Sequence, residues 1–107
     1  MVAVKSFNLI VSKQAQSALK DIVKYISLDS VSAANHVRKT LIALIKSLKT
    51  NPEKFPKEEL LADKKKNYRS VSKWHYKVVY HVTKNEVLIL DIIHTSRNPD
   101  TIKKVDK

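Results

Sequence analysis

Hydrophobic residues in the first half of the chain recur at intervals of three and four, the spacing of a helix with one buried face. This spacing predicts a helix that begins after Ser12, a suitable N-cap residue, and ends at the break formed by Leu28, Asp29 and Ser30. It predicts a second helix that is capped by Ser32 and ends at Asn51-Pro52, because the residue before a proline disfavours the α conformation. The short break between them implies an antiparallel helical hairpin. The apolar positions that carry the pattern are Ala15, Ala18, Leu19, Ile22, Val23, Ile26, Ala34, Val37, Leu41, Leu44, Ile45 and Leu48.

Outside this region the pattern changes to that of strands. Residues Phe7 to Ser12 alternate, and three later segments, Tyr68–Lys73, Tyr76–Val82 and Val87–His94, are rich in β-branched and aromatic residues. Lys84-Asn85 is a plausible tight turn between the last two. We therefore predict an α+β fold with an N-terminal strand, an antiparallel two-helix hairpin and a three-stranded antiparallel meander. The N-terminal strand would complete a four-stranded sheet.

Two segments lie outside the predicted helices and strands, and we expect them to form a loop and a C-terminal tail. Residues Pro52 to Asp63 resemble a loop that contacts the core through Phe55 and Leu60-Leu61. Thr101 to Lys107 is a short basic tail. With 107 residues, the chain fits a single domain, residues 1–107, in which 100–107 form this tail.

Composition narrows the classes of function. The 21 Lys and Arg against 10 Asp and Glu give a net charge of +11, which indicates a nucleic acid, a ribonucleoprotein surface or an acidic protein as partner, although solubility alone is an alternative. The chain has no glycine, which excludes glycine-rich phosphate loops of the Walker or Rossmann kind. It has no cysteine, which excludes disulfides and thiolate metal sites. We expect a cytoplasmic protein, because no apolar run is long enough for a signal or a membrane span. We also expect no cofactor.

The segment from Lys64 to Lys77 combines cations with aromatic residues and contains no acidic residue. Cations neutralise phosphates and aromatic rings stack on unpaired bases, so this combination suits single-stranded RNA. A solvated hairpin whose aromatic residues belong to the core is the alternative. Strand alternation predicts that Lys77 and His81 lie on an open sheet face, beside Arg69 and Lys73 of the neighbouring strand. The predicted nucleic-acid-binding residues are Lys65, Lys66, Arg69, Lys73, Lys77 and His81.

Four histidines, His36, His75, His81 and His94, are candidates for acid–base chemistry, since a group with a pKa near neutrality can assist RNA cleavage by its own 2′-hydroxyl. Each is also an ordinary surface or strand residue, and no pair has the spacing of a metal site. Arg97 follows the last strand, where a guanidinium could bind a phosphate or pair with an acid of the chain. Asp91, within an apolar strand, is expected to form a salt bridge toward a helix or the tail.

The order of these elements, with two local motifs, resembles the RelE/ParE superfamily of type II toxins, which includes plasmid-stabilisation toxins. The resemblance covers nearly the whole chain. It rests most on the strand Tyr76-Lys77-Val78-Val79-Tyr80 and on His94-Thr95-Ser96-Arg97-Asn98-Pro99, and is supported by Tyr68-Arg69-Ser70-Val71 and by the Asn51-Pro52-Glu53-Lys54-Phe55-Pro56 exit from the hairpin. It implies a toxin that a cognate antitoxin holds inactive.

The superfamily has two branches, and the resemblance implies a different mechanism for each. RelE-like members cleave mRNA in the ribosomal A site, and on their pattern Arg69, Lys77 and Arg97 are catalytic, with His94 the first candidate for proton transfer, although His75 or His81 could serve. Val71 stands at a further lysine position of that pattern. The C-terminal tyrosine of that branch has no counterpart in this chain, because Lys103 stands near its place.

ParE-like members instead inhibit DNA gyrase without a nuclease centre, and the long helical hairpin is similar to theirs. We take mRNA cleavage as the main hypothesis. Gyrase inhibition and a non-toxic binding module of the same fold are the alternatives, so ribosome-bound mRNA and DNA gyrase are the two candidate targets.

Overall fold

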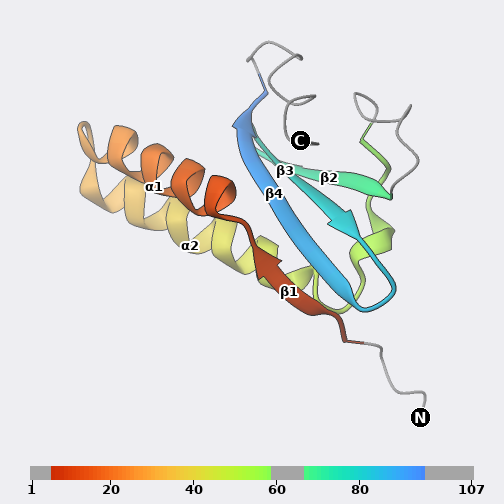
Figure 1. Ribbon diagram of the computed structural model, residues 1–107. Coiled ribbons are helices and arrows are strands. Elements are labelled where there is room, and N and C mark those ends of the chain that lie inside the picture. Colours follow the sequence, from red (N-terminus) through yellow and green to blue (C-terminus); the bar gives the residue numbers. More distant parts are fainter. Residues whose placement is uncertain (1–5, 59–66, 96–107) are drawn as a thin grey trace.

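The computed structural model describes residues 6–58 and 67–95 of the chain. Its elements are β1 (Asn8–Val11), α1 (Lys13–Ser27), α2 (Val31–Ser47), a 3-10 helix η1 (Pro52–Lys54), β2 (Tyr68–Lys73), β3 (Tyr76–Val82) and β4 (Glu86–His94) (Figure 1). The predicted α+β order of one strand, two helices and a three-stranded meander is confirmed.

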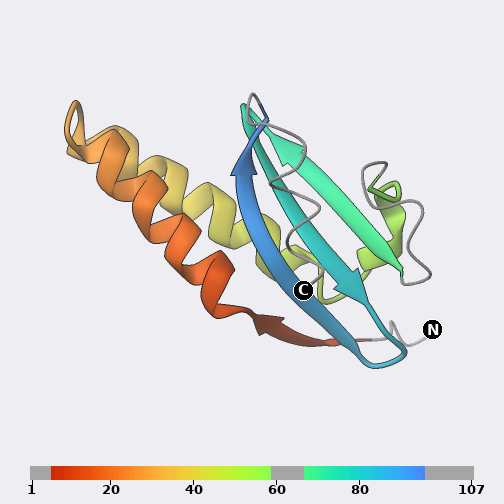
Figure 2. The same ribbon diagram turned by 45° about the horizontal axis from the view of Figure 1, so that its top comes forward.

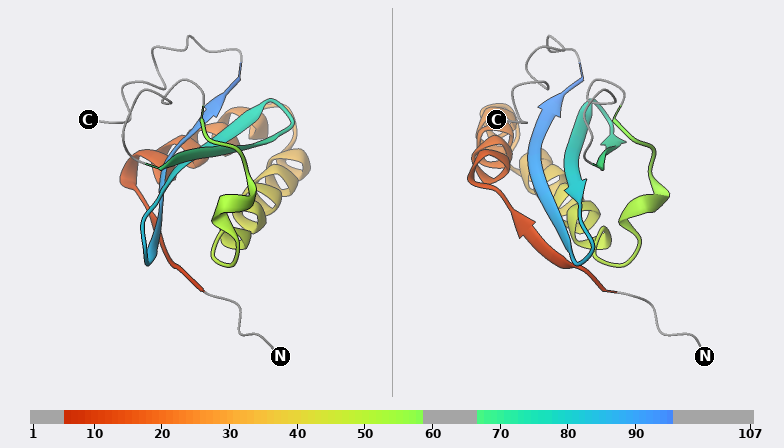
Figure 3. Two further views of the ribbon diagram at one scale, coloured as in Figure 1. Left: turned by 90° about the vertical axis from the view of Figure 1, so that its right-hand side faces the viewer. Right: turned by 45° about the vertical axis from the view of Figure 1, so that its right-hand side comes forward.

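The four strands form one mixed sheet in the order β1-β4-β3-β2. The meander strands are antiparallel, whereas β1 lies at the edge and runs parallel to β4, with Asn8 opposite Glu86 (Figure 3). The chain can join parallel neighbours because the helical hairpin carries it back along the sheet. The N-terminal strand thus completes the sheet, as predicted.

Each of the two helices begins after a serine that has an extended backbone and caps the helix with its hydroxyl. The Ser12 hydroxyl accepts a hydrogen bond from the amide of Ala15 at 3.1 Å, as predicted for an N-cap. The second helix is capped by Ser30, not Ser32: Ser30 is extended (φ −154°, ψ 113°) and accepts from the amide of Ala33. Ser32 already lies in the first turn, where a helical backbone prevents its hydroxyl from capping.

The end of α2 also differs from the prediction. The helix ends at Ser47, before Asn51-Pro52, and Leu48 forms its C-cap. Pro52 instead begins the 3-10 helix η1, where its missing amide hydrogen costs no hydrogen bond. Neither α1 nor α2, nor any other helix in the described ranges, has the length and apolarity to cross a membrane.

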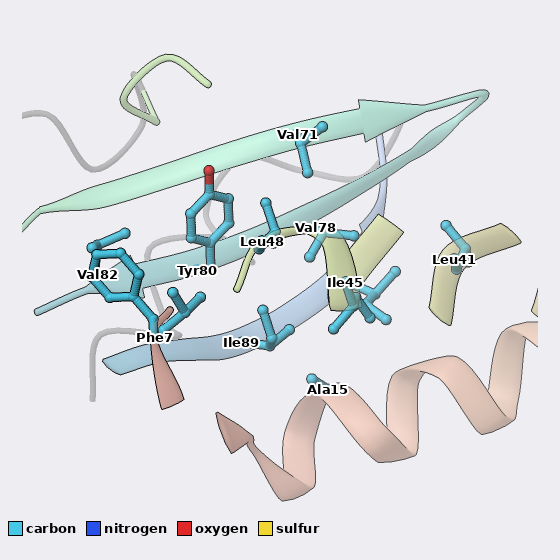
Figure 4. Close-up of a cluster of buried hydrophobic side chains, with 12 residues drawn as sticks. Phe7, Ala15, Leu41, Ile45, Leu48, Val71, Val78, Tyr80, Val82 and Ile89 are labelled. Atoms are coloured by element: carbon cyan, nitrogen blue, oxygen red, sulfur yellow. The ribbon is translucent and has the colours of Figure 1, made fainter. Parts of the chain in front are cut away.

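The main core lies between the helical hairpin and one face of the sheet. Leu41, Ile45 and Leu48 of α2 and its C-cap pack against a sheet face that includes Val78 and Tyr80 (Figure 4). Burial of each large apolar side chain contributes roughly 1.5–3 kcal/mol relative to exposure. The two helices therefore cover only this face, which we call the helix face.

The opposite face of the sheet is predicted to be open, and this prediction is wrong for its centre. Tyr68, Val79 and Ile93 form a second buried cluster there, with Leu90 packed against it. A β-bulge between Val79 and Tyr80 shifts the register with β4, so that Leu90 has no partner residue in the ladder. Apolar residues of β4 thus occupy the face that the alternation of β3 alone assigns to cations.

Candidate functional site

The predicted basic site is divided between the two faces of the sheet. Arg69 lies opposite Tyr80 and Lys73 opposite Tyr76, whereas Lys77 lies opposite Ser72. Directly opposed residues of antiparallel strands share a face. Arg69 and Lys73 therefore belong to the helix face and Lys77 to the other. The prediction that these cations lie side by side is wrong.

The tight β2–β3 turn explains why the cations lie on different faces of the sheet. β2 ends at Lys73 and β3 begins at Tyr76, so two residues, Trp74 and His75, connect the strands. This turn fixes the register, and the face of every cation follows from it. It lies at the same end of the sheet as the C-terminal end of β4 (Figure 2).

Arg69 holds the chain segment that leaves the helical hairpin. Its Nη1 donates to the carbonyl oxygen of Phe55 at 2.6 Å and to that of Glu53 at 3.2 Å. Its Nη2 lies 3.5 Å from the Glu53 carboxylate. The same segment pairs with β2 through the bridge between Lys57 and Arg69. The guanidinium thus fastens η1 to the sheet edge, and two of its nitrogens are engaged.

Lys77 forms an ion pair with a carboxylate that gives no signal in the sequence. Its Nζ lies 3.0 Å from Oε2 of Glu58 and 3.3 Å from Oε1. The Glu58 side chain is 2% exposed and that of Lys77 23% exposed. A pocket of about 370 Å³ borders the pair, lined also by Ser70 and Ser72. A buried carboxylate needs a cation close by, which gives Lys77 a structural task.

The histidines are distributed over both faces. The His94 ring stacks on His75 with centroids 5.7 Å apart and meets Tyr76 edge-on at 5.6 Å. His81 packs against Tyr68 at 5.1 Å, on the face of the second cluster. His94 is opposite Tyr76, on the helix face, and so not on the face of Lys77.

Three predicted site residues, Lys65, Lys66 and Arg97, lie outside the described residues. The structure therefore places Arg69, Lys77 and His94, but brings no two of them into contact within the described ranges. Arg69 and His94 share the helix face, but their partners on β3, Tyr80 and Tyr76, are about 13 Å apart along the strand.

Asp91 faces a helix, one of the two orientations expected for it. Its Oδ2 accepts a hydrogen bond from the Gln14 amide of α1 at 3.4 Å, and its Oδ1 accepts from the amide of Ile92 at 2.8 Å. It is 3% exposed, at the edge of a groove of about 730 Å³ between α1 and the sheet. The helical partner of Asp91 among the described residues is thus the side-chain amide of Gln14, whereas a salt bridge was expected.

Tyr80 lies between the core and η1, and its hydroxyl donates to the carbonyl oxygen of Pro52. The side chain is fully buried. Burial raises the pKa of Tyr80 from 10.0 to about 12; Arg69 lowers the pKa in part and Glu53 raises it. The neutral phenol is therefore the form that the fold requires.

This pKa predicts a loss of stability in alkali. The folded pKa is above the unfolded one, so the stabilisation is complete below pH 10 and falls between pH 10 and about 12. A two-unit shift corresponds to roughly 2–3 kcal/mol in the free energy of unfolding. Urea unfolding from pH 8 to pH 12 measures it, with Tyr80→Phe as control. The variant should be about 1 kcal/mol less stable at pH 8, from the lost hydrogen bond. Because only the wild type loses this stabilisation, the two curves should cross near pH 11 and the variant should be the more stable by about 1 kcal/mol at pH 12. Curves that stay parallel would contradict the assignment.

One strand, a two-helix hairpin and a meander in the sheet order β1-β4-β3-β2 define a RelE/ParE-type toxin fold, the class that the sequence resembles. The comparisons with known proteins identify the family within that class. Residues 9–99 match the family model described as "ParE toxin of type II toxin-antitoxin system, parDE". The chain belongs to the ParE toxin family.

A solved structure described as "Chromosomal ParDE TA system from P. aeruginosa" shares the fold, with a TM-score of 0.69. Its sequence is 17% identical, and the match covers 86% of this chain and 99% of that one. No curated protein matches the chain.

Proposed function

We propose that this ParE-family toxin arrests growth by inhibiting DNA gyrase as a non-catalytic protein ligand. The observation that carries the proposal is the division of the nuclease candidates between two sheet faces. Arg69 is bound to η1, and Lys77 is bound to a buried carboxylate. A cleavage centre needs its cations and its proton donor around one phosphate. Membership of the ParE family supports the same mechanism, and mRNA cleavage takes second place.

We further propose that a cognate antitoxin of the ParD type neutralises the toxin. Both the matched family and the solved relative from P. aeruginosa are described as parts of a toxin–antitoxin pair. A protein with a net charge of +11 attracts an acidic partner at long range and so accelerates their association.

A supercoiling assay with purified gyrase tests the proposed mechanism. Increasing toxin should abolish the introduction of supercoils, and transcripts from induced cells should show no A-site cuts by primer extension. The variant His94→Gln separates the two mechanisms, because it removes the predicted proton donor from a half-exposed site. A non-catalytic inhibitor should keep its full effect on gyrase in this variant. Unchanged supercoiling at high toxin excess, together with cut transcripts that His94→Gln abolishes, would establish mRNA cleavage instead.

A further inference from the structure

The outward face of α2 carries positive charge that the fold does not use. The helix contains Arg38, Lys39 and Lys46 and no Asp or Glu along its whole length. All three cations are exposed. Lys39 and Lys46 are seven residues apart and lie on nearly the same side, opposite the buried stripe of Leu41 and Ile45. Among the described residues, no carboxylate forms an ion pair with either lysine, unlike Lys77.

An exposed aromatic ring stands at one end of this face. Trp74, in the β2–β3 turn, is 47% exposed and lies 5.7 Å from the ring of His36 on α2. Lys39 follows His36 by one helical turn and so is its neighbour on the helix surface. The ammonium of Lys73 lies 5.3 Å from the indole centroid. The turn thus adds an aromatic plane and a further cation to the basic face.

The backbone of Trp74 supports a role for the indole beyond packing. Its φ is 56°, in the left-handed region, at the first of the two turn residues, where hairpins favour glycine. A bulky side chain in that conformation costs about 1–2 kcal/mol. Strain of this kind at an exposed position points to a function for the side chain.

We propose that the outward face of α2 and Trp74 together bind single-stranded nucleic acid. Lys39, Lys46 and Lys73 neutralise phosphates, and a base stacks on the exposed part of the indole. Lys39 and Lys46 are about 10 Å apart along the helix axis, so that both can contact the phosphate backbone of one extended strand. The face differs from the sheet face predicted from the sequence, and of the residues predicted there it includes only Lys73.

The proposed ligand is a nucleic acid rather than an acidic protein because of the residues that are exposed on α2 beside the cations. An acidic helix needs apolar anchors at helical spacing. Between Ser32 and Ser47 the exposed positions of α2 are polar or alanine. The large apolar residues exposed on the helical hairpin, Tyr25, Leu28 and Val31, are grouped at its tip instead. A protein partner would find its anchors there.

Binding to a labelled oligonucleotide tests the proposal without gyrase, so its outcome is independent of the proposed mechanism. The purified full chain is titrated into a single strand of about 12 nucleotides, within the site size of known single-strand binders. Trp74 is the sole tryptophan, so its fluorescence reports stacking directly and should be quenched on binding. Single-stranded DNA and RNA should both bind. Tighter binding to duplex DNA, or equal binding to polyglutamate without quenching, would overturn the proposal.

Two variants separate the phosphate contacts from the stacking. Lys39→Ala/Lys46→Ala should lower the salt dependence of log K by about 1.4, because each phosphate contact to a single strand contributes about 0.7. Trp74→Ala should weaken binding about tenfold and leave the salt dependence unchanged.

The chain offers matched controls on α1. Lys13 and Lys20 are exposed and also seven residues apart, and Tyr25 is an exposed aromatic residue. Lys13→Ala/Lys20→Ala and Tyr25→Ala should bind as the wild type does. Equal losses on α1 and α2 would show that net charge alone governs binding and would overturn the proposal.

Discussion

Replacement of Lys77 by methionine should lower the free energy of unfolding by about 3 kcal/mol, because it removes the cation that lies 3.0 Å from the buried carboxylate of Glu58. The methionine keeps most of the volume of the lysine stem, so lost packing contributes little. Urea unfolding at neutral pH measures the change. Lys46→Met on the exposed face of α2 removes the same charge and should change the free energy by less than about 0.5 kcal/mol.

A double variant distinguishes the buried charge from other causes. Glu58→Gln/Lys77→Met should be more stable than Lys77→Met alone, since it removes the buried negative charge together with the cation that faces it. If Lys77→Met unfolds at the same urea concentration as the wild type, the ion pair does not stabilise the fold. The structural role assigned to Lys77 would then be wrong.

Replacement of Arg69 by alanine should also cost about 3 kcal/mol, because two backbone carbonyls of the 53–55 segment lose a charged donor at once. The loss of stability should be concentrated where η1 contacts β2. η1 should detach from β2, and amide hydrogen exchange should accelerate at Glu58, whose N–H donates to the carbonyl of Tyr68.

Arg69→Lys serves as the comparison for that prediction. A lysine keeps the charge but cannot reproduce the planar fork that reaches both carbonyls, so it should recover less than half of the lost stability. Full recovery by lysine would mean that charge near Glu53 and Tyr80, rather than the two carbonyl contacts, is what the position supplies.

The elements of the fold could be predicted because each leaves a local signal. Helical spacing locates α1 and α2, and the β-branched and aromatic segments locate the strands. The N-cap of α2 is misplaced because both serines are good caps in isolation, and only the extended backbone at Ser30 decides between them. The end of α2 is misplaced for a similar reason, since a proline disfavours a helix before it without requiring that a helix reach it.

The site could not be predicted because it depends on relations between distant segments. The alternation predicted along β3 is correct, but Leu90, at the bulge in β4, packs against the cluster that buries Val79. The two-residue β2–β3 turn decides which face Arg69 occupies. Glu58 gives no local signal, because it lies in a loop and meets Lys77 only after the chain has crossed the sheet edge. Trp74 stands out in the sequence as an aromatic residue among cations, but its left-handed backbone is visible only in three dimensions.

The parallel pairing of β1 with β4 has a consequence for how the chain folds as it is synthesised. Of the four described strands, β1 is synthesised first, but its hydrogen-bonding neighbour β4 is synthesised last. The core beneath it stays open until β4 arrives, because Val87 and Ile89 supply its centre. Long-range pairing of this kind also slows folding. The core between the helices and the sheet can therefore close only after nearly the whole described part of the chain has been synthesised.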